Sequence, residues 1–432
     1  MLQKIQFEFN SEKLKTTFKY SKSDFTRQKK LTFSITLQLM SNLIRKSLAL
    51  EVVNFVDTFN VNNATKLSSF TTSAFIQSRN KIKPKVFKHL SSTIVSEFYT
   101  DNELSIKLWN GFRLLAVDGS TLTLPQTKEL ESIYGLAKNQ TNTGVVQARV
   151  SVLYDVLNSF VIDSELSSLK IGEASLAKNH LAYSQQNDLI IYDRGYPSFD
   201  LVYEHAILNR DFLFRIKESF SNVVKTFVSS GKKSQIVVIK PGQKKTAISF
   251  IDKEYDYEST IKVRLISVKL NDNTNEILMT SLLDSKKYNT KKFKELYFKR
   301  WGVETFYDEL KNKLKVEHFS GYSNNTIQQD FNLAIFISNL QSLIVNDLEE
   351  EIQAETKNRK HNYKVNTNLS YGFLKDRIIF LLQQGNDINQ ELRLLFKQHL
   401  IPIRPNRNNQ REIGKYKRRE KPKVPKNQKD TI

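Results

Sequence analysis

The order of strand-like and helix-like segments between residues 112 and 217 is the feature that most constrains the fold. Three strand patterns come first, followed by a helix, a short apolar strand, a second helix and a further strand. Their expected positions are residues 112–125, 147–156, 160–166, 173–183, 189–192, 199–208 and 212–217. Three consecutive strands followed by alternating helices and strands predict an α/β fold with a mixed sheet.

The sequence on either side of this order divides the chain into six expected regions. Residues 1–105 are expected to be mainly helical, because one apolar stripe recurs at three- and four-residue spacing: Leu37, Met40, Ile44, Leu48, Val52 and Phe55. Residues 106–218 and 286–345 form two parts of the α/β core, and residues 219–285 an inserted β module between them. The module's expected strands are 236–239, 247–251, 261–270 and 276–283. A helical region, 346–403, and a disordered basic tail, 404–432, complete the chain.

The charge balance indicates a polyanionic partner. The chain holds 66 Lys and Arg against 45 Asp and Glu, a formal net charge of +21. A codon bias toward Lys would also favour Glu, so it does not account for the surplus. Nucleic acid is the natural counterpart of such a charge, and an anionic membrane surface is the rival.

Two further observations weaken the membrane alternative and narrow the chemistry. The most apolar window, residues 31–59, carries Arg45, Lys46 and Glu51, so it is expected to be a buried helix rather than a membrane span. The N-terminus lacks the apolar core of a signal peptide, and a soluble, cytoplasmic protein is therefore expected. The absence of Cys excludes disulfides, thiolate zinc sites and Cys nucleophiles.

A short basic segment in the N-terminal region is a candidate DNA contact. Ser73 is expected to cap a helix that presents Gln77, Arg79 and Lys81, and Pro84 to help end it. Helix-turn-helix modules bind DNA through short helices of this kind. A solvated basic helix on an ordinary bundle fits the same residues, and the pattern does not decide between the two.

Two aspartates follow apolar strands. Asp118 comes after Leu-Ala-Val, and Asp193 after Ile-Ile-Tyr, so both are expected at or near strand ends. Carboxylates at the carboxyl ends of sheet strands are exposed to a crevice while the core fixes their neighbours. A single Asp at such a position is more often part of a turn.

A polar ridge on the helix expected from Thr290 to about Lys315 adds a third acid. Tyr297, Arg300, Glu304 and Lys311 lie at offsets of 0, 3, 7 and 14 residues, within an arc of roughly 60° on an α-helix. An adjoining apolar face can pack on the sheet, and Trp301 is expected to pack rather than to stack on a base. An ordinary amphipathic helix with surface ion pairs would show a similar pattern.

Taken together, these residues resemble the three signature regions of bacterial insertion-sequence transposases of the Asp-Asp-Glu class. The matching segments are Val117-Asp118-Gly119, Asp193-Arg194-Gly195-Tyr196 and Tyr297-x2-Arg300-x3-Glu304-x6-Lys311. The last of these is similar to the Tyr-Arg-Glu-Lys signature that defines one subgroup. The resemblance covers about residues 70–345, and residues 73–79 are more loosely similar to the N-terminal DNA-binding regions of such proteins.

The resemblance implies a ribonuclease-H-like core, a mixed five-stranded sheet with helices on both faces, with the β insertion at residues 219–285. Asp118, Asp193 and Glu304 would be the catalytic metal ligands for two Mg²⁺ ions, with Mn²⁺ as a substitute. Oxygen ligands suit such hard cations. Tyr297, Arg300 and Lys311 would bind DNA phosphates, with Arg79 and Lys81 as further DNA contacts.

The implied function is that of a transposase that binds the terminal inverted repeats of its element. It would cut the 3′ ends and join them to target DNA, as a homodimer on double-stranded DNA in the bacterial cytoplasm. Two alternatives stay open: a metal-dependent nuclease of the same fold, and a sequence-specific DNA-binding protein without catalytic activity.

Overall fold

The computed structural model describes residues 2–27, 30–42, 46–101, 105–138, 144–242, 253–271, 274–383 and 386–404. The expected strand at 247–251, Ile44 of the apolar stripe and the basic tail beyond Arg404 lie outside these residues. The described chain forms two compact units. The first unit comprises the described residues within 1–106, 122–148 and 308–432, and the second those within 107–121 and 149–307.

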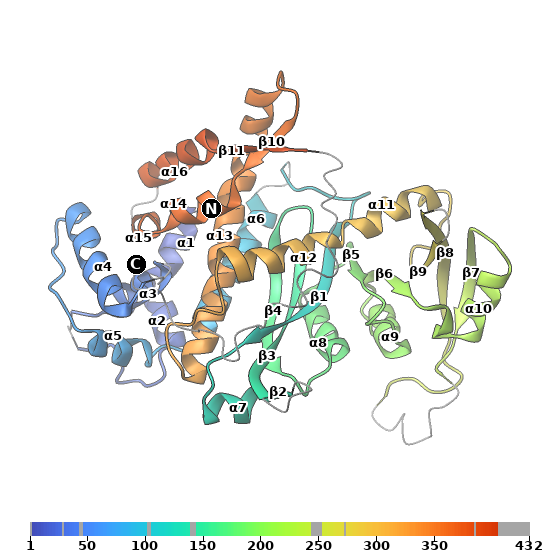
Figure 1. The fold of residues 1–432 in the computed structure, drawn as a ribbon, viewed down its shortest axis with the longest axis horizontal. Coiled ribbons are helices and arrows are strands. Elements are labelled where there is room, and N and C mark those ends of the chain that lie inside the picture. Colours follow the sequence, from blue (N-terminus) through green and yellow to red (C-terminus); the bar gives the residue numbers. More distant parts are fainter. Residues whose placement is uncertain are drawn as a thin grey trace, which may run out of the picture. The chain divides into compact units, whose positions relative to one another are not determined.

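The second unit holds the α/β part of the chain (Figure 1). Counting those it shares with the first unit, its elements are β1 (Arg113–Thr123), β3 (Gly144–Asp155), β4 (Phe160–Ser168), α8 (Glu173–His180), β5 (Asp188–Tyr192), α9 (Phe199–Ile207), β6 (Asp211–Ile216), α10 (Asn222–Ser229), β7 (Ser234–Ile239), β8 (Ile261–Asn271), β9 (Thr274–Thr280), α11 (Phe293–Phe298) and α12 (Trp301–Asp308).

Strands β1 to β9 form one mixed sheet, in agreement with the predicted α/β class, and β10 (Asn362–Val365) and β11 (Leu400–Ile403) pair separately in the first unit. The order of the mixed sheet is β2-β3-β1-β5-β6-β9-β8-β7, with β2 at Leu136–Lys138 and with β4 paired to β3. Strands β1, β5 and β6 run parallel, whereas β9, β8 and β7 are each antiparallel to their neighbours. The expected β module therefore extends the core sheet instead of standing apart. Strand β9 pairs with β6, which would otherwise be left as an unpaired edge.

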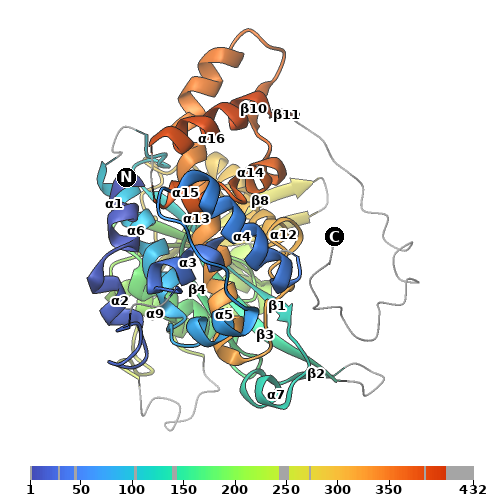
Figure 2. The same ribbon diagram turned by 90° about the vertical axis from the view of Figure 1, so that its left-hand side faces the viewer.

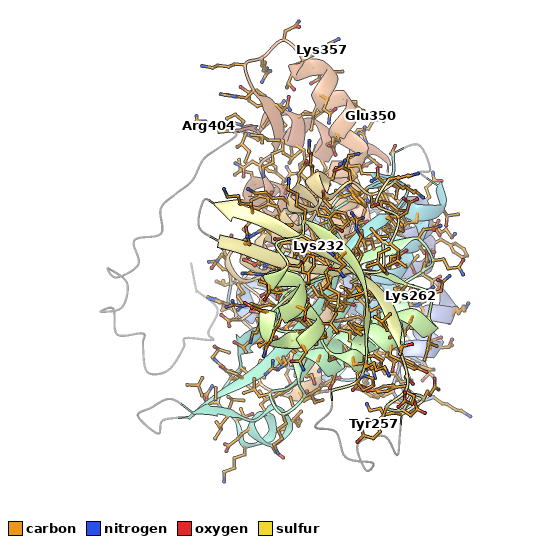
Figure 3. The ribbon with its side chains drawn as sticks, turned by 90° about the vertical axis from the view of Figure 1, so that its right-hand side faces the viewer. Lys232, Tyr257, Lys262, Glu350, Lys357 and Arg404 are labelled. Carbon is orange, nitrogen blue, oxygen red and sulfur yellow. The ribbon has the colours of Figure 1, made fainter. Side chains whose placement is uncertain are left out.

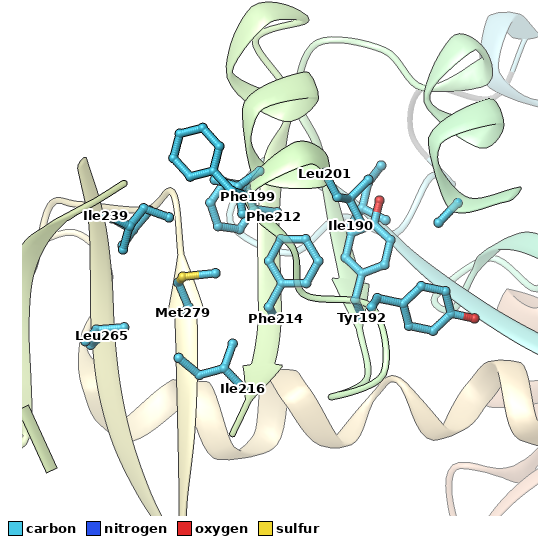
Figure 4. Packing of buried hydrophobic residues seen from close by; sticks show 14 of the residues in the cluster. Ile190, Tyr192, Phe199, Leu201, Phe212, Phe214, Ile216, Ile239, Leu265 and Met279 are labelled. Atoms are coloured by element: carbon cyan, nitrogen blue, oxygen red, sulfur yellow. The ribbon is translucent and has the colours of Figure 1, made fainter. Parts of the chain in front are cut away.

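The packing around strand β5 shows that this sheet is covered on both faces. All five of its residues are buried, as expected of a central parallel strand. Ile190 and Tyr192 join a cluster with residues of α9 and α10, part of which is drawn in Figure 4. Leu189 and Ile191 join a second cluster with residues of α11. Because side chains alternate along a strand, these are the two opposite faces of the sheet.

The expected helix from Thr290 to about Lys315 is not one continuous α-helix. A 3₁₀ turn at Thr290–Lys292 leads into α11, which ends at Phe298, and α12 begins at Trp301. A π-helical segment, Glu309–Lys313, follows α12. Because the chain changes its hydrogen-bond pattern twice, the angles of a single α-helix do not give the true directions of the ridge residues. π-Helical turns are rare in proteins, and those that occur often lie at functional sites.

The first unit is mainly helical, as expected for residues 1–105 and 346–403. Its elements outside those shared with the second unit are α1 (Leu2–Phe9), α2 (Glu12–Phe18), α3 (Phe33–Ser41), α4 (Leu48–Asn62), α5 (Thr72–Arg79), α6 (Lys85–Asp101), α7 (Lys128–Tyr134), β2, α13 (Asn324–Thr356), β10 (Asn362–Val365), α14 (Thr367–Leu374), α15 (Ile378–Leu381), α16 (Asn386–Gln398) and β11 (Leu400–Ile403).

Helix α13 organises the first unit. It runs for 33 residues and packs along α6, as Figures 1 and 2 both show. Its central part, from Phe331 to Ile344, is buried all round, as expected of a helix in the middle of a core. The buried polar groups on it are paired, for example the Asn339 Nδ2 that donates to Ser91 Oγ at 2.8 Å. Within the described residues, no helix is long and apolar enough to cross a membrane.

Candidate active site

Asp118 and Asp193 lie on neighbouring parallel strands, just beyond the point where the pairing of the two strands ends. The last registered pair between β1 and β5 is Val117 with Tyr192, so each Asp directly follows a member of that pair. Strand β1 itself continues to Thr123, which places Asp118 within a strand and not after one. The buried pair therefore fixes both carboxylates at one edge of the sheet.

Glu304 is brought to the same region by close packing of α12 on the sheet. A Cβ atom at Gly302 would lie 3.2 Å from Cβ of Val156, so the helix backbone packs directly against the Val156 side chain, just after β3. Phe306 stacks on Tyr154 with ring centroids 5.0 Å apart. The Tyr307 hydroxyl donates to the carbonyl oxygen of Asp118 at 2.8 Å. These contacts place Glu304 on a helix that is held rigidly against β1 and β3.

Arg300 connects two of the three acids. Its side chain is buried, with Nη1 3.6 Å from Oδ2 of Asp118 and with Nη2 paired to Oε1 of Glu304. Asp193 has different partners: the Tyr297 hydroxyl donates to its Oδ1 at 3.1 Å, and Nη1 of Arg215 lies 3.7 Å from the same oxygen. The acids are thus surrounded by two guanidinium groups and one phenol, all of which can also bind phosphate.

The electrostatics of Asp118 reflect this crowding. The pKa of its carboxyl is raised to about 6, chiefly by burial and to a smaller extent by Glu304 and Asp193, against the lowering by the Gly119 amide and Arg300. Like charges that share a site disfavour one another's ionised forms. The three carboxylates therefore interact even where no direct contact joins them.

This raised pKa predicts a pH-dependent gain in stability for Asp118→Asn in the metal-free protein. The pKa of this carboxyl is about 6 in the folded protein and 3.8 ordinarily, so the folded state is favoured while the group is protonated. The free energy of unfolding therefore falls as the pH rises from 3.8 to about 6. At pH 7.5 the variant is expected to be more stable by about 2 kcal/mol, and near pH 4 by almost nothing. Urea unfolding with chelator at both pH values measures this. A difference that does not change with pH would contradict it.

The residues present fit a divalent cation by their chemistry. Mg²⁺ prefers carboxylate and water oxygens, and Asp118, Asp193 and Glu304 supply three carboxylates without any competing His or thiolate. As they stand, no three His, Asp or Glu side chains among the described residues converge closely enough to hold a metal ion. The guanidinium of Arg300 instead supplies positive charge between Asp118 and Glu304. These acids could hold a metal once Arg300 exchanges its partners.

The remaining residues of the predicted ridge have different positions. Tyr297 is buried beside the acids, whereas Lys311 lies in the π-helical segment of the first unit. Trp301 does not pack into the core as expected: it is 44% exposed, beside the still more exposed Phe298. Trp301 directly follows the break between α11 and α12, where the angles of a single continuous helix do not apply.

Arg79 is buried, so the expectation that it faces DNA from an exposed helix is wrong. Its guanidinium donates to Gln329 Oε1 at 3.0 Å and to Ser320 Oγ at 2.6 Å, and it pairs with Asp330 at 3.0 Å. Helix α5 forms as expected, but Thr71 rather than Ser73 accepts the capping hydrogen bond. Lys81 lies beyond the end of this helix, half-buried, with its Nζ 6.0 Å from the centre of the Phe25 ring.

Two residues of the site, Arg215 and Tyr307, were not predicted from the sequence. Arg215 is a half-buried charged residue in an otherwise apolar strand, β6, and it also pairs with Glu276 on β9. A charge that interrupts an apolar run was the available signal for it. Tyr307 is a buried aromatic residue on α12 whose role depends on one hydroxyl contact, and no pattern distinguishes it from the other aromatic residues of the helix.

One known protein family matches the part of the chain that carries these residues. A family model described as "Transposase DDE domain" matches residues 109–340, more than half of the chain. The chain belongs to this family of transposase domains.

The chain is also similar to two individual transposases. The chain is 21% identical over 244 residues to the transposase InsG for insertion sequence element IS4 from Escherichia coli (strain K12). That match covers 56% of this chain, which spans about half of the relative, 53% of its length. A structure of the piggyBac transposase synaptic complex with hairpin DNA aligns with a TM-score of 0.43 and 10% identity, over 94% of this chain and 87% of that one. This last likeness is too distant to carry an argument.

Proposed function

We propose that this protein is a DNA transposase of an insertion sequence, of the subgroup with the Tyr-x2-Arg-x3-Glu-x6-Lys signature. It binds the terminal inverted repeats of its element, cuts the 3′ ends and joins them to target DNA. The observation that carries the proposal is the placement of Asp118, Asp193 and Glu304 by three separate elements around a shared electrostatic environment. Membership of the transposase DDE domain family supports it.

The sheet order supports a ribonuclease-H-like core. Strands β4, β3, β1, β5 and β6 are neighbours in this order, with Asp118 on β1 and Asp193 directly after the adjacent β5. We propose that these five strands are the catalytic core and that β9, β8 and β7 are the family's insertion, joined edge to edge onto it.

The proposed chemistry assigns a role to each residue. Asp118, Asp193 and Glu304 would hold two Mg²⁺ ions, or Mn²⁺ in their place. Bound there, such ions supply stabilisation of the attacking and leaving oxygens of the phosphodiester. Arg300 neutralises the acids in the metal-free protein, and it becomes available to a DNA phosphate once its charge is no longer needed there. Tyr297 keeps the Asp193 carboxylate in place by its hydrogen bond, and Lys311 is proposed as a further phosphate contact.

Double-stranded DNA is the proposed partner, both as element ends and as target. A homodimer would hold two ends together, and the proposed substrate places the protein on the nucleoid in the cytoplasm. The net charge of +21 is what a protein that binds the phosphate backbone would need around a site made of acids.

The test uses a labelled duplex that carries the inverted repeats flanking the gene, with Mg²⁺ and a supercoiled target plasmid. We expect cleavage at the 3′ end of the repeat and covalent joining of that end to the plasmid. Cleavage without joining would favour a nuclease of the same fold, and binding without cleavage a DNA-binding protein without catalytic activity. Either outcome would contradict the proposed strand transfer.

A further inference from the structure

A second polar site lies in the second unit, apart from the three acids. It is a cavity of about 340 Å³ at the start of β7 and of the 3₁₀ turn before α11. Its polar lining consists of Arg264, three hydroxyl residues and two amide residues: Ser234, Ser285, Thr290, Gln235 and Asn289. None of the described residues that line it carries a carboxylate. A cavity with a cation and several donors but no acid has the composition of an anion site.

Arg264 is the central group of this cavity. It is 1% exposed, and its Nε donates to Ser234 Oγ at 2.8 Å and its Nη1 to the Tyr288 carbonyl at 2.7 Å. Among the described residues it makes no ion pair, and its Nη2 has no hydrogen-bond partner. Buried arginines are almost always paired with an acid. The buried charge of Arg264 thus lacks the counter-ion that burial normally requires.

Asp284, whose charge acts on Arg264, does not fill this role. Asp284 acts on Arg264 only through space, and its carboxylate is engaged by the backbone amides of Lys286 and Lys287 at 2.8 and 3.0 Å. Phe293 provides a weaker compensation, with its ring centre 5.5 Å from the guanidinium carbon. Asp284 and Phe293 therefore offset part of the Arg264 charge without forming an ion pair with it.

The chain that borders the cavity adds to this charge. The ten residues from Ser285 to Lys294 include five lysines, all exposed: Lys286, Lys287, Lys291, Lys292 and Lys294. Lys262, labelled in Figure 3, lies on β8 two residues from Arg264 and is also exposed. Exposed lysines around a cavity draw in a polymer of phosphates more strongly than a single small ion, because each phosphate neutralised releases counter-ions.

From these observations we infer that the Arg264 cavity binds a phosphate group of DNA, on the premise that the protein acts on DNA as proposed above. The same segment runs from Thr290 directly into α11, which carries Tyr297. Seven residues of helical chain span roughly 10 Å, about three base steps along a DNA strand. A strand whose scissile phosphate lies at the acids can therefore reach the cavity with a phosphate a few nucleotides away. The cavity would fix the path of the DNA and not take part in the chemistry.

The experiment measures binding of a terminal-repeat duplex without divalent metal, so that its result does not depend on cleavage. Thr290→Asp introduces a negative charge at the cavity without altering Arg264, and an acid suits the first residue of a helical turn. We expect its affinity for the duplex to fall about tenfold, with a flatter salt dependence. Arg264→Met is expected to weaken binding by a similar factor. Gln186→Asp is the matched control, because Gln186 is exposed just before β5, at the opposite end of that strand from Asp193.

The outcomes separate the possible sources of phosphate. If the cavity binds only a small ion, millimolar inorganic phosphate raises the Tm of the wild-type protein but not that of Thr290→Asp. The DNA affinity of Thr290→Asp then equals that of the wild type. That result, or wild-type DNA affinity in both variants, would overturn the inference. If Arg264→Met fails to fold, Thr290→Asp decides alone. Weakened DNA binding in a protein that never cleaves DNA would support the cavity and contradict the proposed transposase reaction, so the two failures are distinguishable.

Discussion

Glu304→Gln is expected to reduce metal-dependent cleavage of terminal-repeat DNA by about 10³-fold or more. The substitution keeps the size of the side chain and one acceptor oxygen, but it replaces the second oxygen by an NH2 donor and removes the charge that would hold the cation. Glu304 lies on α12, where Gly302 and Phe306 fix the helix against the chain after β3 and against β3 itself, so a neutral side chain cannot be compensated by a shift of the helix. The rate is measured from product formation under single-turnover conditions.

The matched control is Glu295→Gln on the neighbouring helix α11. Glu295 is 82% exposed at its side chain, and among the described residues its carboxylate pairs with Lys299 alone, so the same chemical change should leave cleavage within a factor of about two. Both variants should bind the duplex in the absence of metal. Cleavage by Glu304→Gln at the wild-type rate would show that Glu304 is not a catalytic residue.

Arg79→Met is expected to destabilise the first unit by about 3 kcal/mol, the scale of breaking a buried ion pair. The substitution fills the space of the side chain but leaves Asp330 and Gln329 without the donors that now satisfy them. The same Asp330 carboxylate accepts from the Ser320 amide at 2.6 Å, so the loss extends to the loop before α13. Urea unfolding followed by far-ultraviolet circular dichroism measures it.

Lys81→Met is the control for this prediction. Lys81 makes a contact with the Phe25 ring but no ion pair among the described residues, and its replacement should change stability by less than about 1 kcal/mol. If Arg79→Met instead folded as stably as the wild type and lost DNA affinity, Arg79 would be a DNA contact, as its sequence context first indicated.

The difference between Arg79 and Glu304 shows what the sequence could and could not predict. The apolar runs before Asp118 and Asp193 identify buried strands, because only central strands tolerate continuous apolar sequence. The four-residue spacing of Arg300 and Glu304 is a local pattern too, because side chains four residues apart on a helix meet. Arg79 has an equally regular local pattern, but its environment is set by Gln329 and Asp330, some 250 residues away along the chain. Burial that depends on such distant partners leaves no local signal.

Two further features of the structure also leave no local signal in the sequence. The pairing of β9 with β6 joins the expected β module to the core sheet and brings Glu276 to Arg215, beside Asp193. Strand pairing between non-adjacent segments depends on which edges are free, and a single sequence does not reveal this. The π-helical segment after α12 depends on one extra residue per turn, which changes the direction of Lys311 without changing the composition of the helix.

The most direct test of the central claim, that Asp118, Asp193 and Glu304 form one metal site, is the number of Mn²⁺ ions bound per chain. Electron paramagnetic resonance of the complex with a terminal-repeat duplex counts free and bound Mn²⁺ without any need for turnover. The wild-type protein is predicted to bind two ions, and Asp118→Asn and Glu304→Gln to lose at least one each while still binding DNA. Two ions bound with unchanged affinity in both variants would contradict the account.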